Sequence, residues 1–157
     1  MRARTHPPRV RTGCDLQRIE DVADAIRTFG DRYLDRVYTP VEQRAGRIGG
    51  AASLAARFAA KEAVLKLIGT ADGVDLRSVE VDQEAGRPVV RLTDRARDLA
   101  EAVGLGPVDV SLSHSGDHAM AVAVAMVAPT TDPHHQHTDQ HDDHHTDHHT
   151  EHGGTTA

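Results

Sequence analysis

The hydrophobic positions in the first forty residues include one clear helical pattern. From Ile19 they recur every three or four positions, as on one face of a helix, and the short stretch at 10–15 before them is predicted to be a strand. These helical positions are Ile19, Val22, Ala23, Ile26 and Phe29. A second, shorter helix is predicted over 33–37. This part of the chain therefore predicts a strand that leads into two helices.

The middle of the chain predicts a long helix made of strong helix formers. Before it, Thr39, Pro40 and Glu42 predict a separate helix that begins at Pro40, because threonine can cap, proline suits the first helical position and glutamate can close a capping box. Residues 51–68 contain no Gly or Pro and are rich in Ala, Leu, Lys and Glu, until Gly69 supplies a stop. We expect the helix over 51–68 to be the longest one.

The remaining apolar pattern predicts two pairs of strands with a helix between them. Apolar residues at 76–81, a Gly-Arg-Pro turn at 86–88 and a returning strand at 89–92 predict a hairpin. A helix follows, and then strands over 108–112 and 119–127. In the last strand Met and Val occupy one face and mostly Ala the other, and this small face can take a closely packed helix. The order of elements predicts an α+β domain with a largely antiparallel sheet.

Composition favours one domain with an aliphatic core. The chain has 157 residues, of which 38% are hydrophobic and 27% charged, and only 3% are aromatic. Small Ala-rich domains often gain stability by association, so an oligomer is expected. The single cysteine, Cys14, excludes an intrachain disulfide framework and is expected to pack in a buried strand. No run resembles a signal peptide or a membrane-spanning helix, which favours the cytoplasm.

The two ends of the chain differ in composition from the domain predicted at 9–128. The lead-in at 1–8 begins an arginine-rich stretch, which we interpret as solvated and not as a nucleic-acid contact. The tail at 129–157 has one aliphatic residue, Ala157, so it is expected to be disordered. It holds nine of the 12 histidines, which could bind Zn, Ni or Cu ions loosely, but their spacing defines no four-ligand site. Six of the 24 acidic residues also lie there, which leaves the domain electrically balanced.

Two carboxylates and three cations in the middle of the chain are candidates for chemistry. Asp15 ends the first strand and Glu62 lies on the long helix, so they can meet only if strand and helix pack together. Paired carboxylates suit Mg²⁺, whereas a solvated i,i+4 pair of Glu62 with Lys66 is the commoner arrangement. Arg57 and Lys61 form a second i,i+4 pair, which can hold a pyrophosphate or be an ordinary solvated charged face.

Three motifs contain these residues and share a resemblance to one family. The motifs are Gly13-Cys14-Asp15, Arg57-Phe58-Ala59-Ala60-Lys61-Glu62-Ala63-Val64-Leu65-Lys66 and Ser111-Leu112-Ser113-His114. Their order and spacing, with the Gly-Arg-Pro hairpin, resemble the holo-acyl-carrier-protein synthase family over about residues 9–127. The resemblance implies the 4′-phosphopantetheinyl transferase fold, with a mainly antiparallel sheet packed with a long central helix. It also implies a homotrimer with active sites between subunits.

The resemblance further implies an activity and a role for each residue. The expected reaction is Mg²⁺-dependent transfer of 4′-phosphopantetheine from coenzyme A to a serine of an apo acyl carrier protein, for fatty acid or polyketide synthesis. Adenosine 3′,5′-bisphosphate is released. Asp15 and Glu62 are the implied metal ligands, and Arg57, Lys61, Lys66 and His114 the implied coenzyme A contacts. Glu62 and Lys66 are the implied catalytic residues, with Glu62 or a metal-bound water accepting the serine proton.

One departure from the family pattern affects the expected partner, and a second affects the expected coenzyme A loop. Asp21 replaces an arginine that often helps to grip the carrier, and the usual Gly-Thr-Gly after the long helix reads Gly-Thr-Ala at 69–71. A basic face for an acidic carrier can still form from other arginines. These are Arg18, Arg27, Arg32 and Arg36. Two alternatives stay open: a degenerate module that only binds carrier protein, and a metal-buffering protein that acts through its His-rich tail.

Overall fold

The computed structural model describes residues 9–128 and shows an α+β arrangement, as the hydrophobic pattern predicts. The lead-in at 1–8 and the tail at 129–157 lie outside the described residues, so the predictions about them stay predictions. The elements in chain order are β1 (Arg9–Arg18), α1 (Ile19–Phe29), α2 (Asp31–Val37), α3 (Pro40–Ile68), the 3₁₀ helix η1 (Leu76–Ser78), β2 (Val79–Glu84), β3 (Arg87–Leu92), α4 (Asp94–Ala102), β4 (Leu105–Ser115) and β5 (His118–Val127).

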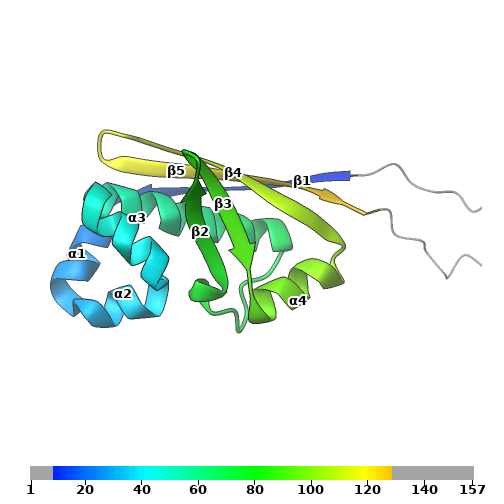
Figure 1. Ribbon diagram of the computed structural model, residues 1–157, viewed down its shortest axis with the longest axis horizontal. Coiled ribbons are helices and arrows are strands. Elements are labelled where there is room, and N and C mark those ends of the chain that lie inside the picture. Colours follow the sequence, from blue (N-terminus) through cyan, green and yellow to red (C-terminus); the bar gives the residue numbers. More distant parts are fainter. Residues whose placement is uncertain (1–8, 129–157) are drawn as a thin grey trace, which may run out of the picture.

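Two antiparallel sheets make up the β structure. The larger sheet has the order β1-β5-β4, and β2 and β3 form a separate hairpin. In Figure 1 the larger sheet lies along one side of α3, with α1 and α2 near one end of that helix and α4 near the other. The first and last strands pair along their whole lengths, from Arg9↔Val127 to Arg18↔His118. The two ends of the described chain therefore lie side by side.

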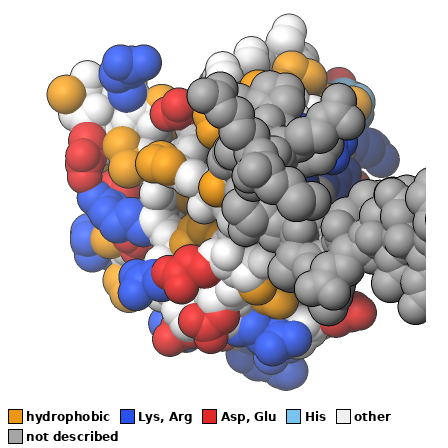
Figure 2. All heavy atoms as spheres, turned by 90° about the vertical axis from the view of Figure 1, so that its right-hand side faces the viewer, with side chains coloured by type: hydrophobic (Ala, Val, Ile, Leu, Met, Phe, Trp, Pro, Cys, Tyr) orange, Lys and Arg blue, Asp and Glu red, His pale blue; other side chains and the backbone are white. Residues whose placement is uncertain are grey.

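The described surface carries both signs of charge. On the face shown in Figure 2, Lys and Arg side chains lie next to Asp and Glu side chains, with hydrophobic ones between them. This mixture agrees with the balanced charge of the domain. Among residues 9–128, the chain forms no helix that is both long enough and apolar enough to cross a membrane.

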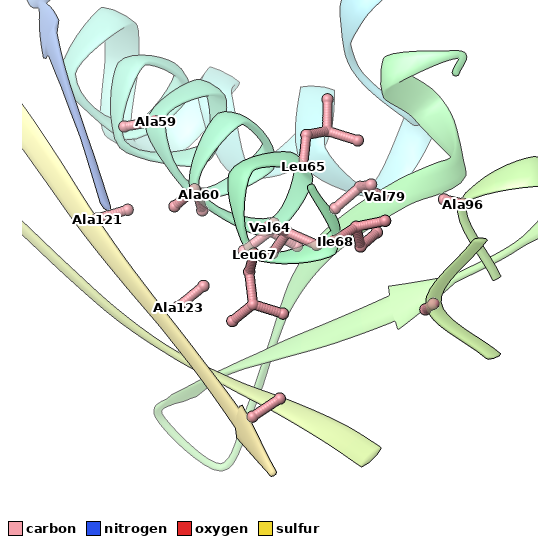
Figure 3. Packing of buried hydrophobic residues seen from close by; sticks show 14 residues of the cluster. Ala59, Ala60, Val64, Leu65, Leu67, Ile68, Val79, Ala96, Ala121 and Ala123 are labelled. Atoms are coloured by element: carbon pink, nitrogen blue, oxygen red, sulfur yellow. The ribbon is translucent and has the colours of Figure 1, made fainter. Parts of the chain in front are cut away.

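The core lies between α3 and the inner face of the larger sheet. Every second residue of β5 from Ala119 to Ala125 is an alanine that is at most 3% exposed. The facing side of α3 also carries small buried residues, and larger aliphatic side chains of α3 extend the core toward β2 (Figure 3). Side chains of one carbon let a helix and a sheet approach closely, which confirms the closely packed helix predicted for this face. The facing alanines of α3 are Ala59, Ala60 and Ala63.

The helix α3 begins at the predicted capping box and contains a kink. The hydroxyl of Thr39 accepts a hydrogen bond from the Glu42 backbone, and the Glu42 carboxylate accepts one from the Thr39 N–H at 2.8 Å. Pro40 occupies the first turn. At Gly50 the backbone leaves the helical region, with φ 65° and ψ −160°, which glycine adopts readily. The helix therefore consists of two segments, 40–49 and 51–68, and the second ends at Gly69 as predicted.

The outer face of the larger sheet carries large apolar side chains. Five of them are between 37% and 62% exposed: Val10, Leu16, Met120, Val124 and Met126. Cys14 is exposed as well, so the prediction that it is buried is wrong. Successive residues of a strand point to opposite faces, and Gly13 takes the inward position beside it. We call this surface the outer sheet face.

Candidate functional site

Strand β1 approaches α3 unusually closely at Gly13. A Cβ atom on this glycine would lie 2.0 Å from the carbonyl oxygen of Ala63 and 3.0 Å from the backbone nitrogen of Leu67. Any larger residue would therefore push strand and helix apart. Asp15 lies two residues further along and points to the same side of the sheet as Gly13. The glycine of the first motif thus allows its aspartate to lie beside the helix.

Asp15, Glu62 and Lys66 form one cluster between β1 and α3. The Nζ of Lys66 lies 2.7 Å from Oδ1 of Asp15 and donates to the Cys14 carbonyl at 3.0 Å. Burial and the negative charge of Asp15 raise the pKa of Glu62, while Lys66 acts in the opposite direction. The hydrogen bond to Asp15 raises the pKa of Lys66. The side chain of Lys66 is 53% exposed and that of Asp15 18%, so a ligand can reach the cluster from solvent.

The two carboxylates of this cluster fit a hard divalent cation. A cation beside both would offset the burial and the repulsion that raise the pKa of Glu62. Mg²⁺ usually takes one or two protein carboxylates and completes its octahedron with water and phosphate oxygens. Residues 9–128 bring no group of three or more His, Cys, Asp or Glu side chains into metal-binding arrangement. Asp15 and Glu62 therefore offer a two-carboxylate site that suits Mg²⁺.

Arg57 lies on a different side of α3, against the β2–β3 hairpin. Its Nε donates to the Val81 carbonyl at 3.2 Å, and its Nη1 donates to Oγ of Ser53 at 2.6 Å. Burial lowers the pKa of the guanidinium. Arg57 is 8% exposed. The structure thus keeps Arg57 apart from the carboxylate cluster but leaves a small part of it open to solvent.

Lys61 lies on the same side of α3 as Arg57 and has no exposed surface. Its Nζ is 2.8 Å from Oε2 of Glu42 and 2.9 Å from the Leu76 carbonyl, and it also donates to the Val79 carbonyl. An ammonium group has three N–H donors, and these three partners use all of them. A role of Lys61 as a coenzyme A contact therefore does not fit the geometry.

The partner of Lys61 shows what the sequence alone misses. The sequence predicts Glu42 only as a helix cap, but its carboxylate also accepts a hydrogen bond from the Val81 N–H at 2.8 Å. Glu42 and Lys61 are both fully buried. The capping role follows from neighbouring residues, whereas the contacts with Lys61 and Val81 involve residues far along the chain, so the sequence does not show them.

His114 lies on β4, on the far side of β5 from the cluster. It pairs with Ala119, which pairs in turn with Gln17 of β1. Strands two positions apart are separated by about 10 Å, from the usual strand spacing. His114 is exposed, and in the described part of the chain no hydrogen bond or ion pair links it to Asp15, Glu62 or Lys66. The structure of one chain thus does not bring His114 into the cluster.

The arginines predicted to meet an acidic carrier differ in their pairing. Arg27 contacts Glu20 at 2.6 Å and also Asp24, and Arg18 lies 3.8 Å from Asp21. Acids of α1 therefore offset the positive charges of Arg27, on the same helix, and of Arg18, at the end of β1. Two exposed arginines of α2 form no ion pair within residues 9–128, so their positive charges are less offset than those of Arg18 and Arg27. These residues are Arg32 and Arg36.

Comparisons with known proteins agree with this arrangement. Residues 11–123, which include all three motifs, match the model of the 4′-phosphopantetheinyl transferase superfamily. A holo-[acyl-carrier-protein] synthase of Moorella thermoacetica is 45% identical over 119 residues, which cover 73% of this chain and 91% of the relative. That of Koribacter versatilis is 38% identical over 118 residues, or 72% and 94%. A solved ACPS–CoA complex from Chronobacterium ammoniagenes is 28% identical, with a TM-score of 0.67 over 78% of this chain and 99% of the other.

Proposed function

This chain belongs to the 4′-phosphopantetheinyl transferase superfamily, and we propose that it acts as a holo-[acyl-carrier-protein] synthase. Such an enzyme moves 4′-phosphopantetheine from coenzyme A to a serine of an apo acyl carrier protein. The names of the curated relatives support this activity, and the solved coenzyme A complex supports coenzyme A as the co-substrate. The observation that carries the proposal is the solvent-accessible cluster of Asp15, Glu62 and Lys66.

We assign the metal ligands of this reaction to Asp15 and Glu62. Bound there, Mg²⁺ would supply positive charge to the pyrophosphate of coenzyme A. The serine oxygen forms a bond to the phosphorus nearest pantetheine, and the bond from that phosphorus to the bridging oxygen breaks, which releases adenosine 3′,5′-bisphosphate. Lys66 offsets the charge on the phosphate oxygens during this step. Glu62 lies at the proposed metal site and is the proposed acceptor of the serine proton.

Two further residues are proposed contacts for coenzyme A. Arg57 is a cation with a small exposed surface beside the hairpin, which suits a phosphate. His114 is exposed on β4 but lies apart from the cluster of its own chain. A neighbouring copy of the chain can bring its His114 next to the cluster of Asp15, Glu62 and Lys66, as expected if active sites lie between subunits.

We propose that the chain forms a homotrimer that covers the outer sheet face. The large apolar side chains on this face, among them Leu16 and Met120, are exposed in the single chain, and a contiguous exposed apolar surface favours association. Sedimentation velocity tests the assembly. A Leu16→Asp change on this face should shift the protein from trimer to monomer, whereas a stable, fully active wild-type monomer would contradict the proposal.

The partner is proposed to be an acyl carrier protein of fatty acid or polyketide synthesis. The carrier proteins that this family modifies are acidic. Arg32 and Arg36 of α2, which form no ion pair within residues 9–128, offer positive charge to such a surface. The cytoplasm is the proposed compartment, in line with a chain whose one cysteine cannot form an internal disulfide.

The deciding experiment measures the intact mass of an apo acyl carrier protein after incubation with this protein, coenzyme A and Mg²⁺. We expect a gain of one phosphopantetheine group that a chelator prevents. A chain that ends at residue 128 should keep this activity, which would separate a transferase from a metal buffer acting through the tail. No transfer to any carrier of a fatty acid and polyketide panel would contradict the proposal and favour a module that only binds carrier protein.

A further inference from the structure

We propose that the buried Glu42–Lys61 pair positions the second segment of α3 and thereby sets Glu62 and Lys66 against Asp15. The inference rests on the proposed function, because it concerns the placement of residues assigned there to the metal and the phosphate. It gives Lys61 a positioning role in place of a contact with coenzyme A. The order Lys61-Glu62 in the second motif then has a physical meaning, with one residue anchored inside and the next presented outside.

Each member of the pair is held by three hydrogen-bond partners. The Glu42 carboxylate accepts from the N–H of Thr39, the N–H of Val81 and the ammonium of Lys61, each at 2.8 Å. Lys61 directs its two other N–H donors at carbonyls of η1 and β2. Both side chains are fully buried, where a hydrogen bond is stronger than in water and an unpaired charge is costly. The pair therefore has one favourable arrangement.

The pair also bridges the kink of α3. Glu42 lies in the segment 40–49 and Lys61 in the segment 51–68, and the backbone between them is not helical at Gly50. The helical hydrogen bonds consequently do not carry the orientation of the first segment into the second. A side-chain tie across the kink can do so, and this one also fixes both segments to β2 through Val81.

The second segment is held from two sides. At 100° per residue, Lys61 and Ala63 lie about 200° apart around the helix, so they face nearly opposite directions. Ala63 contacts β1 at Gly13, and Lys61 is fixed to β2 and Glu42. Glu62 lies between them in sequence and projects toward Asp15. Rotation of the segment about its axis would move Glu62 and Lys66 together, and catalytic groups tolerate little displacement.

Two variants separate positioning from stability. Lys61→Met leaves the Glu42 carboxylate buried without its cation, so it should unfold more readily. In the double variant Glu42→Gln/Lys61→Met both charges are gone, and the glutamine oxygen can still accept from Thr39 or Val81. Replacing a buried ion pair by well-packed uncharged side chains of similar volume is often neutral for stability, whereas removing one partner is costly. Val37→Ala, at a residue of α2 that is 4% exposed, serves as a control that weakens the fold without touching the pair.

The readouts are the dissociation constant for Mn²⁺, measured by electron paramagnetic resonance, and kcat and KM for coenzyme A at saturating Mn²⁺. In the double variant we expect near wild-type melting, Mn²⁺ binding weakened by about tenfold, as for other outer-shell changes, and a lower kcat with KM within about twofold. The control should lower the melting temperature and leave Mn²⁺ binding unchanged.

Two results would overturn the inference. Mn²⁺ binding of the double variant within twofold of wild type would show that the pair is only structural. A raised KM for coenzyme A with unchanged Mn²⁺ binding and kcat would make Lys61 a substrate contact. Failure of the wild-type protein to bind Mn²⁺ or to modify a carrier would instead contradict the proposed function, so the two failures can be told apart.

Discussion

Helix α3 carries two lysine–carboxylate pairs that differ in almost every physical respect. Lys61 and Glu42 are fully buried and connect two helical segments and a strand. Lys66 lies five residues after Lys61 and pairs with Asp15 of β1 at the surface, where the lysine side chain is 53% exposed. The first pair is surrounded only by protein, whereas the second is open to ligands. A lysine paired with a carboxylate therefore stabilises the fold where it is buried and is open to a ligand where it is exposed.

The largest effect should come from a change at the exposed cluster. Glu62→Gln removes one proposed metal ligand and the proton acceptor, so we expect transfer to a carrier protein to fall at least about 10³-fold. The fold should stay intact, because Glu62 takes no part in the buried pair. Single-turnover transfer and circular dichroism of the same sample check both statements. Full activity of this variant would remove Glu62 from the mechanism.

A matched pair of amide substitutions compares the two carboxylates directly. Glu42→Gln leaves Lys61 buried beside a neutral partner, and we expect the free energy of unfolding to fall by about 3–5 kcal/mol. Asp15→Asn breaks a pair whose lysine is 53% exposed and should change it by less than about 1 kcal/mol. Urea denaturation of both variants gives the comparison. Equal losses would show that burial does not distinguish the two pairs.

A change at the contact between β1 and α3 should affect the exposed pair of Lys66 and Asp15 and not the buried pair of Lys61 and Glu42. Gly13→Ala places a Cβ atom 2.0 Å from the Ala63 carbonyl oxygen, so β1 must shift, at an expected cost of about 1–3 kcal/mol. The shift moves Asp15 away from Glu62 and should lower Mn²⁺ affinity. Gly106→Ala is the control, because its Cβ would meet the Met126 carbonyl oxygen at 3.2 Å, far from the cluster. Equal Mn²⁺ affinities for the two variants would contradict this role of Gly13.

The smallest effect concerns pH. The pKa of Glu62 is raised in the folded protein, so the unfolded chain loses this proton first, near its ordinary pKa of about 4.3. Between that value and the raised pKa the folded state binds more protons, and stability falls as pH rises. Unfolding free energies of wild type and Glu62→Gln, measured from pH 4 to 8, should therefore diverge in favour of the variant. A gap that opens in favour of wild type would contradict the stated environment of Glu62.

Local signals made most of the fold predictable. The capping box at Thr39 and Glu42 depends on residues three positions apart, and the strand β5 on a simple alternation, so both follow from sequence. The predicted turn at 86–88 is displaced, because Arg87 and Pro88 already belong to β3. The kink at Gly50 joins two predicted helices into one element. Boundaries of this kind depend on packing and not on local preference.

The misses at the site have one common cause, which is that sequence does not show which side of an element is buried. The side chains of Arg57, Lys61, Glu62 and Lys66 follow ordinary helical spacing, but only the fold decides that two of them face the hairpin and two face β1. Cys14 is predicted to be buried because its strand is predicted to be buried. The inward position went to Gly13, and the thiol faces out.

The pairing of β1 with β5 has a consequence for how the protein is made. Asp15 is among the first residues of the domain to be synthesised, but within residues 9–128 its strand hydrogen-bonds only to β5, which ends at Val127. During synthesis from the N-terminus, α1 to α4 can begin to form while β1 and β4 still lack that partner. Such a long-range pairing is slow to form, since the whole intervening chain must first close into a loop. The proposed site is consequently a late product of folding, because β1 reaches its final pairing only after residues 118–127 have been made.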